Sequence, residues 1–239
     1  MLEIIFSTTP CENMINLFGI THLSITTISV ITAILIVKHK MNLNFIIKAS
    51  TIIVFILHLM VYVWYHFSPE SFIVKGLPLY TCRMTMYLLM FGIFFNNKFC
   101  LKLGNYWGFF GGIAGLILPT MFKYPFPHIL QISTFTLHVY IFLVSTYYLF
   151  VERIGMNKKD LKMCCLCTVS FLIVITIING ILGSNYSATF KMPAHLINFG
   201  FNIPVGTCAI VVILGYLAAI FTQYKLVNKY EEKMLEKVK

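Results

Sequence analysis

Long apolar runs alternate with short polar connections along the whole chain. The runs cover about residues 18–42, 45–66, 78–95, 101–119, 128–150, 161–182 and 203–223. Each approaches the roughly 20 residues that a helix needs to cross a ~30 Å hydrocarbon core. The pattern therefore predicts an all-α polytopic membrane protein, whose seven transmembrane helices form a single domain over residues 1–223.

The composition agrees with a lipid environment. Hydrophobic residues make up 59% of the 239 residues and charged residues only 11%, whereas a soluble domain carries about 25% charged residues. The net charge of +10 does not form a basic face interleaved with stacking aromatic residues, so no nucleic-acid partner is expected. The expected partner is the lipid bilayer itself.

The positions of the basic residues predict the orientation of the chain. Fourteen of the 18 lysines and arginines lie in the connections on one side and in the C-terminal tail, whereas the opposite connections hold only Lys75, Lys123 and Lys191. Positive charge collects on the cytoplasmic side of membrane proteins. We therefore expect the N-terminus outside and the C-terminus in the cytoplasm. Residues 224–239 alternate Lys, Glu and apolar residues, and predict a cytoplasmic basic amphipathic tail.

Polar side chains that are costly to bury in lipid gather at one depth. In the predicted orientation they fall in the outer half of the bilayer or in the loops just above it, although they come from five different spans. They are His22, His58, Cys82, Arg83, His128, His138, Asn179, Asn185 and Tyr186. Ionisable groups inside a membrane usually mark a functional site, so this layer is where we look for chemistry.

Arg83 and the histidines each allow two interpretations. A charged Arg83 inside a span either extends to the outer surface or faces a polar cavity and binds an anionic group such as a phosphate. A single buried histidine, such as His22 or His58, commonly hydrogen-bonds a backbone carbonyl, and otherwise contributes to a binding site. The histidines show no paired spacing on one helix, so no metal site and no cofactor are expected.

Cys82 and His138 form the pair with the clearest chemical potential. A thiolate is an effective nucleophile, and a neighbouring imidazole can accept the thiol proton. The sequence alone leaves this as one of many Cys–His combinations.

A run of glycines has the spacing of a close helix–helix contact, and we assign it to packing. It consists of Gly104, Gly108 and Gly112, with Gly111 and Gly115 beside them.

Five stretches of residues carry a resemblance to a known family. They are Thr21-His22-Leu23-Ser24; Val63-Trp64-Tyr65 with Leu77-Pro78-Leu79-Tyr80-Thr81-Cys82; Asn105-Tyr106-Trp107-Gly108 with Gly111-Gly112 and Leu118-Pro119; Phe126-Pro127-His128 with Leu137-His138; and Ile178-Asn179 with Gly183-Ser184-Asn185-Tyr186. In their order and spacing the chain resembles the YwaF-like integral membrane proteins, the bacterial branch of the transmembrane protein 164 family.

The resemblance implies acyl transfer between lipids at a cysteine-centred site. Cys82 would be the nucleophile and His138 the base. His22, His128, Asn185 and Tyr186 would line the site. From their position in the same layer we also expect Arg83 and His58 to bind the substrate. The expected partner is a phospholipid or lysophospholipid, and the expected location is the bacterial plasma membrane.

Two other functions remain open from the sequence. The same polar residues would line the path of a small-molecule or lipid transporter, although no inverted repeat of the kind common in transporters is visible. They would also suit a seven-helix protein that binds a ligand without chemistry. The sequence leaves the oligomeric state open.

Overall fold

A computed structural model describes residues 2–11, 17–68, 70–120, 122–192, 197 and 203–236. Helices occupy all seven predicted positions. They are α2 (Ile20–His39), α3 (Asn44–Phe67), α4 (Thr81–Phe94), α5 (Lys98–Ile117), α6 (Ile129–Phe150), α7 (Lys158–Leu182) and α9 (Cys208–Glu236). Three short elements accompany them: α1 (Leu2–Ile5), the π-helix η1 (Phe72–Gly76) and the 3-10 turn η2 (Tyr186–Ala188). The all-α prediction is confirmed for the described residues.

Five of these helices are long and apolar enough to cross a membrane, namely α2, α3, α6, α7 and α9. The helix α4 has 14 residues, which corresponds to about 21 Å, less than the ~30 Å hydrocarbon core. The helix α5 has 20 residues, but glycine and polar residues interrupt its apolar pattern. The structure thus supports a multi-pass membrane protein with five candidate spans, whereas seven crossings and their orientation stay predictions.

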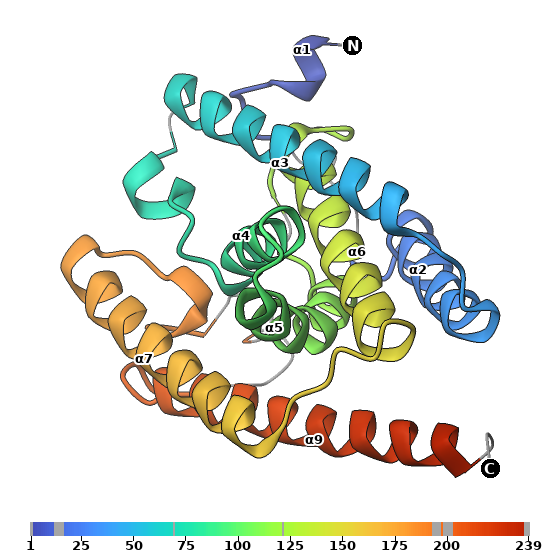
Figure 1. The fold of residues 1–239 in the computed structure, drawn as a ribbon. Helices are drawn as coiled ribbons and strands as arrows, with labels where there is room; N and C mark the ends of the chain where they lie inside the picture. The colour runs from blue at the N-terminus through green and yellow to red at the C-terminus, as the bar shows by residue number, and fades with distance from the viewer. Residues whose placement is uncertain are drawn as a thin grey trace.

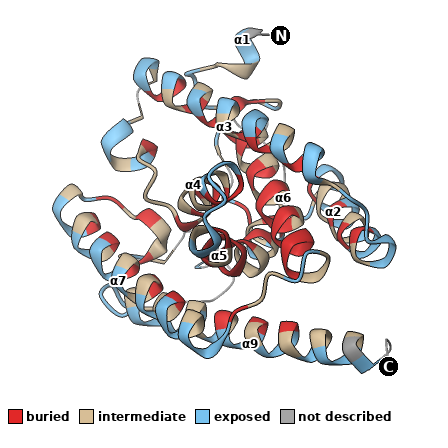
Figure 2. Ribbon diagram, in the orientation of Figure 1, coloured by how far each residue is buried: buried red, intermediate tan, exposed pale blue. Residues whose placement is uncertain are grey.

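The two less apolar helices lie at the centre of the molecule. In Figure 1, α4 and α5 are surrounded by α3, α6, α7 and α9, with α2 beside α6. Of the five candidate spans α6 is the most enclosed, because 72% of its most apolar stretch is buried, against 17–28% for the others. The outer helices turn pale, exposed faces away from this centre (Figure 2). Those exposed faces are apolar because lipid is their solvent.

The glycines of α5 allow the central helices to approach closely. A Cβ added at Gly104 would stand 3.0 Å from the Leu89 side chain of α4, and one at Gly112 would stand 2.7 Å from the Phe142 Cβ of α6. A Cβ at Gly108 would lie 2.2 Å from the Ser145 hydroxyl. The glycine spacing thus serves packing against two neighbouring helices, as its pattern indicates.

The last helix continues beyond the predicted seventh span. The helix α9 runs without interruption from Cys208 to Glu236, so the described part of the tail extends the same helix. The buried Gln223 of α9 donates a hydrogen bond from its Nε2 to the Asn105 carbonyl of α5, at 3.3 Å. This bond joins the end of the apolar stretch to the central pair of helices.

Candidate functional site

Cys82 lies in the first turn of the short helix α4, which begins at Thr81. With 14 residues, α4 is shorter than a helix that crosses a ~30 Å hydrocarbon core. Its C-terminal end is followed at once by the exposed Asn96, Asn97 and Lys98, which require water. Cys82 thus lies at the opposite end of α4 from this exposed polar stretch.

The first turn of α4 provides a favourable environment for a negatively charged sulfur. The Cys82 side chain is partly exposed, and its sulfur lies close to the backbone N–H of the next residue, Arg83. The N-terminus of a helix carries a partial positive charge that stabilises an anion beside it. The position of Cys82 thus suits a reactive thiol better than a position in the middle of a helix would.

The imidazole of His138 in α6 lies beside the Cys82 thiol, close enough for the two groups to interact. Its Nδ1 lies 2.8 Å from the Thr134 carbonyl oxygen one turn earlier. A carbonyl only accepts hydrogen bonds, so Nδ1 carries the proton and the lone pair of the neutral ring is on Nε2. The imidazole is thus held in the tautomer that can accept a thiol proton.

Hydroxyl groups from two other elements hold the start of α4. The Thr81 N–H donates to Ser187 Oγ at 2.9 Å, and that hydroxyl donates to the Leu79 carbonyl at 3.1 Å. From α9, the Tyr216 hydroxyl donates to Thr81 Oγ1 at 2.5 Å. The residue next to Cys82 is therefore fixed by the loop after α7 and by the last helix.

The guanidinium of Arg83 is bound by backbone carbonyl groups. Its Nη1 donates to the carbonyl oxygens of Lys75, Gly76 and Leu77, at 3.2, 2.6 and 2.9 Å. Its guanidinium also lies 4.8 Å from the centre of the Tyr80 ring. The side chain is only 8% exposed. Arg83 thus holds the connection from η1 to α4, which positions the first turn that carries Cys82.

Tyr186 joins the same connection to the loop after α7. Its hydroxyl donates to the Ile73 carbonyl at 2.7 Å and accepts from the Leu77 N–H at 3.2 Å. Burial raises the pKa of the Tyr186 hydroxyl, so that it stays protonated and able to donate. The Asn179 side chain of α7 pairs with both the backbone N–H and the carbonyl of Tyr186. This loop is thus built around a buried tyrosine.

Asn185 braces the same loop from within. Its Oδ1 accepts from the backbone N–H groups of Phe190 and Lys191, and its Nδ2 donates to the Lys191 carbonyl at 2.8 Å. The amide therefore shapes the segment that follows η2.

His22 and His128 both bond to backbone carbonyls. His22 lies 2.6 Å from the Leu116 carbonyl through Nε2 and accepts from the Phe18 N–H through Nδ1, so it ties α2 to the end of α5. His128 caps the start of α6 through Nδ1, and its Nε2 lies 2.9 Å from the Ser7 carbonyl. Their geometry follows the common pattern for single buried histidines.

His58 differs from the other histidines of this layer. It is 2% exposed, and within the described part of the chain neither ring nitrogen has a hydrogen-bond partner. Its ring lies 4.8 Å from that of Tyr62 and 6.4 Å from that of Tyr87. The hydroxyls of those two tyrosines pair with each other at 2.9 Å.

The chain matches the TMEM164 family over residues 12–222. It belongs to this family. The match includes the five stretches that carry the resemblance and every residue expected at the site, and it confirms the family part of that resemblance. Among curated protein sequences and solved structures, none matches this chain.

The residues around the pair were only partly visible in the sequence. Cys82 and His138 are brought together, whereas the partners of Arg83, His22 and Asn185 described above are backbone groups. Tyr216 and Ser187 carried no signal, because hydroxyl side chains are common in helices and loops. Gly115 did carry a signal, since it lies in the glycine-rich stretch, but its spacing indicated packing between helices and not the contact with the His138 ring that the structure shows.

Proposed function

We propose that this TMEM164 family member is a membrane-embedded lipid acyltransferase that uses Cys82 as the nucleophile and His138 as the base. The observation that carries the proposal is the close approach of Cys82, in the first turn of α4, to His138 of α6. A thiol with an imidazole partner, whose other nitrogen is held by a carbonyl, has the three parts of a nucleophilic site.

In the first half-reaction the enzyme takes an acyl group from a phospholipid. The Cys82 proton passes to His138 Nε2 while the sulfur attacks the ester carbonyl carbon. The oxygen of the resulting tetrahedral adduct carries a negative charge, which the N-terminal end of α4 would stabilise. When the adduct collapses, the ester C–O bond breaks and the alkoxide takes the proton from His138. A lysophospholipid leaves, and the acyl group stays on Cys82 as a thioester.

The second half-reaction reverses these roles. An acceptor hydroxyl, such as that of a second lysophospholipid, gives its proton to His138 and attacks the thioester carbonyl. The C–S bond breaks, and the sulfur recovers the proton from His138. The products are a new ester and the free thiol, so the cycle requires no cofactor.

We place the first turn of α4 within the apolar layer, because α4 is shorter than the hydrocarbon core and its other end is followed by exposed polar residues. This depth supports a lipid as the substrate. Acyl esters of phospholipids lie near the boundary between headgroups and hydrocarbon, at the depth at which an abbreviated helix would present Cys82. We further propose seven crossings, with the N-terminus outside, because of the bias of fourteen basic residues against three. The motif spacing favours the bacterial YwaF-like branch and a plasma-membrane location.

The other site residues take supporting roles in this proposal. Arg83 and Tyr186 hold the connection that leads into α4, while His22, His128 and Asn185 hold the helix ends and the loop around the site. His58 is the candidate for contact with substrate after a rearrangement of the Tyr62–Tyr87 pair, since its ring nitrogens are not used by the protein.

A transporter or a non-catalytic binding protein is the alternative. Such a protein would use the polar residues as a lining and would require no bond to Cys82. The two readings differ in one property, because only the acyltransferase forms a covalent acyl-protein intermediate.

The test is direct capture of that thioester. The purified protein is incubated with a phospholipid carrying a radiolabelled acyl chain, and we expect a protein-bound label that neutral hydroxylamine releases. Cys82→Ser should remove this hydroxylamine-sensitive label, and His138→Gln should slow its formation. Cys100→Ala, which changes a partly exposed thiol on α5, serves as the control and should keep it. Full acyl transfer by Cys82→Ser would refute the proposal.

A further inference from the structure

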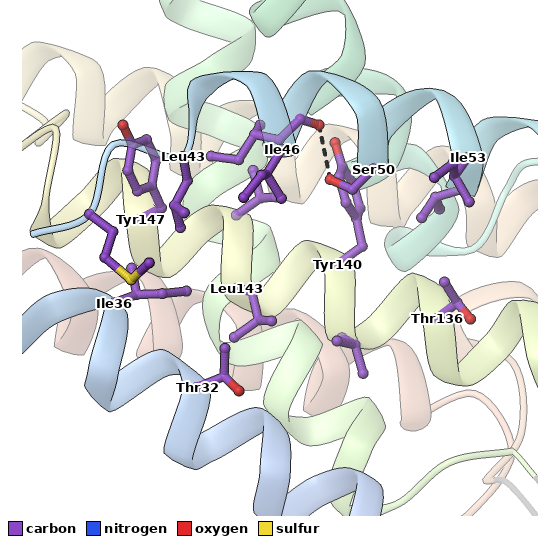
Figure 3. A pocket seen from close by; sticks show the side chains of 15 residues that line it. Thr32, Ile36, Leu43, Ile46, Ser50, Ile53, Thr136, Tyr140, Leu143 and Tyr147 are labelled. Atoms are coloured by element: carbon purple, nitrogen blue, oxygen red, sulfur yellow. Dashed lines mark hydrogen bonds between the residues drawn. The ribbon is translucent and has the colours of Figure 1, made fainter. Parts of the chain in front are cut away.

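A second feature of the fold lies apart from the Cys82–His138 pair. A cavity of about 390 Å³ lies between α2, α3 and α6. Figure 3 shows its walls, with Ile36 from α2, Ile46, Ser50 and Ile53 from α3, and Thr136 and Leu143 from α6. Neither Cys82 nor His138 lines it. The His138 ring lies against Gly115 of α5, whereas Thr136 and Val139 line the cavity, so α6 separates the two places.

Among the described residues, four of the five polar side chains that line the cavity, all except Thr136, have hydrogen-bond partners within the protein. The Ser50 hydroxyl donates to the Ile47 carbonyl at 2.9 Å, and the Tyr140 hydroxyl pairs with Thr51 at 2.8 Å. The hydroxyl of Tyr147, which also lines the cavity, donates to Glu152 at 2.5 Å. A water molecule or a polar ligand would lose hydrogen bonds on entering a lining of this kind. The walls therefore suit hydrocarbon.

The cavity is elongated along two neighbouring helices. On α3 its lining extends from Leu43 to Val54, and on α6 from Tyr147 back to Thr136. Each stretch covers 11 residue steps, or about 16 Å along a helix. Half of a ~30 Å hydrocarbon core is about 15 Å. The cavity is thus a groove about as long as the hydrocarbon region of one leaflet is thick.

We propose that this groove binds one acyl chain of a membrane lipid, in addition to the lipid that reacts at Cys82. The chain would lie along α3 and α6 with its headgroup beyond the Leu43 end. There the exposed Lys40 stands next in sequence to the lining residue Met41, and its charge suits a lipid phosphate.

Packing drives this binding, because lipid tails are as apolar as the groove. An empty groove would leave its walls without dispersion contacts on one side, and a flexible chain restores them. The helices α2 and α3 expose apolar faces to lipid, at residues such as Ile34 and Ile56, so a chain can enter sideways from the bilayer. The site does not depend on acyl transfer at Cys82.

The experiment uses the full chain in lipid nanodiscs doped with a phosphatidylcholine that carries a diazirine on one acyl chain. After irradiation, mass spectrometry should find the label concentrated in residues 41–54 and 136–147. Ser50→Phe should reduce that label about tenfold, because the ring occupies the space of the chain. Ile52→Phe is the matched control, since this residue lies on α3 outside the lining and is 49% exposed. It should label like the parent protein.

The contrary result is equally clear. A label distributed over lipid-facing positions of α7, such as Ile177 and Ile181, and unchanged by Ser50→Phe would overturn the proposal. If Ser50→Phe does not fold, native mass spectrometry of the parent protein decides, because one lipid should stay bound through detergent exchange and none would refute the site. Cys82→Ala should leave the labelling unchanged, so failure of the acyltransferase proposal is recognised separately.

Discussion

The backbone of Gly115 in α5 lies directly against the imidazole ring of His138 in α6. A Cβ at this glycine would stand 2.0 Å from Cδ2 and 2.2 Å from Nε2 of that ring, closer than the 3.0 Å that real Cβ atoms respect. The ring is also tied to its own helix through the Thr134 carbonyl. The space left by the missing side chain of Gly115 therefore fixes the position of the ring and of its Nε2 atom.

Gly115→Ala should displace His138 and impair the reaction at Cys82. Because a shift of about 1 Å in a catalytic group can cost ~100-fold in rate, we expect a loss of that order in the rate of thioester formation. Gly111→Ala is the control, since a Cβ there would meet nothing within 4 Å. It should leave the rate unchanged. An unaffected rate in Gly115→Ala would show that the ring is not needed where it lies.

Tyr216 and Thr81 should act as a coupled pair. Tyr216→Phe removes the 2.5 Å hydrogen bond to the residue that starts α4, and Thr81→Val removes its acceptor. Each should slow acylation of Cys82, and the double variant should be little worse than either one, with a coupling of about 1 kcal/mol. A double-mutant cycle on the acylation rate measures this. Strictly additive effects would mean that the bond does not position Cys82.

Arg83→Lys should destabilise the fold although it keeps the charge. All three bonds come from Arg83 Nη1, which lies one bond farther from the backbone than a lysine ammonium. The shorter lysine would lose these contacts, so we expect a loss of about 2–3 kcal/mol in the free energy of unfolding. Thermal unfolding in detergent, with the exposed Lys123→Gln as control, gives the comparison. If stability is retained while affinity for anionic lipid vesicles falls, Arg83 binds an anion as the sequence first suggested.

The predicted orientation can be tested with a membrane-impermeant amine reagent on intact cells. Lys75, Lys123 and Lys191 should react from outside, because they lie on the side that carries few positive charges. Lysines 158 and 159 should react only after the membrane is permeabilised. Reaction of those two lysines in intact cells would reverse the orientation and would place Cys82 near the cytoplasmic surface.

The fold was more predictable than the number of crossings. Apolar runs of helical length located all seven principal helices, because every segment that contacts lipid must be predominantly apolar. The same criterion is weak for segments that face protein. The helices α4 and α5 lie at the centre, so α4 is short and α5 keeps glycines and polar residues that lipid would not tolerate.

By itself the sequence determined the membrane environment, the positions of the helices and the resemblance to the family. It also identified a layer of polar residues that are costly to bury in lipid, among them Cys82 and His138. Only the tertiary structure decided which of these residues meet. Cys82 and His138 are 56 positions apart, and helical periodicity reports the local solvent of a residue but not its distant partner. The contact depends on α5, where the missing side chain of Gly115 makes space for the ring. The carbonyl partners of Arg83 were hidden for the same reason, since backbone groups look identical in every sequence.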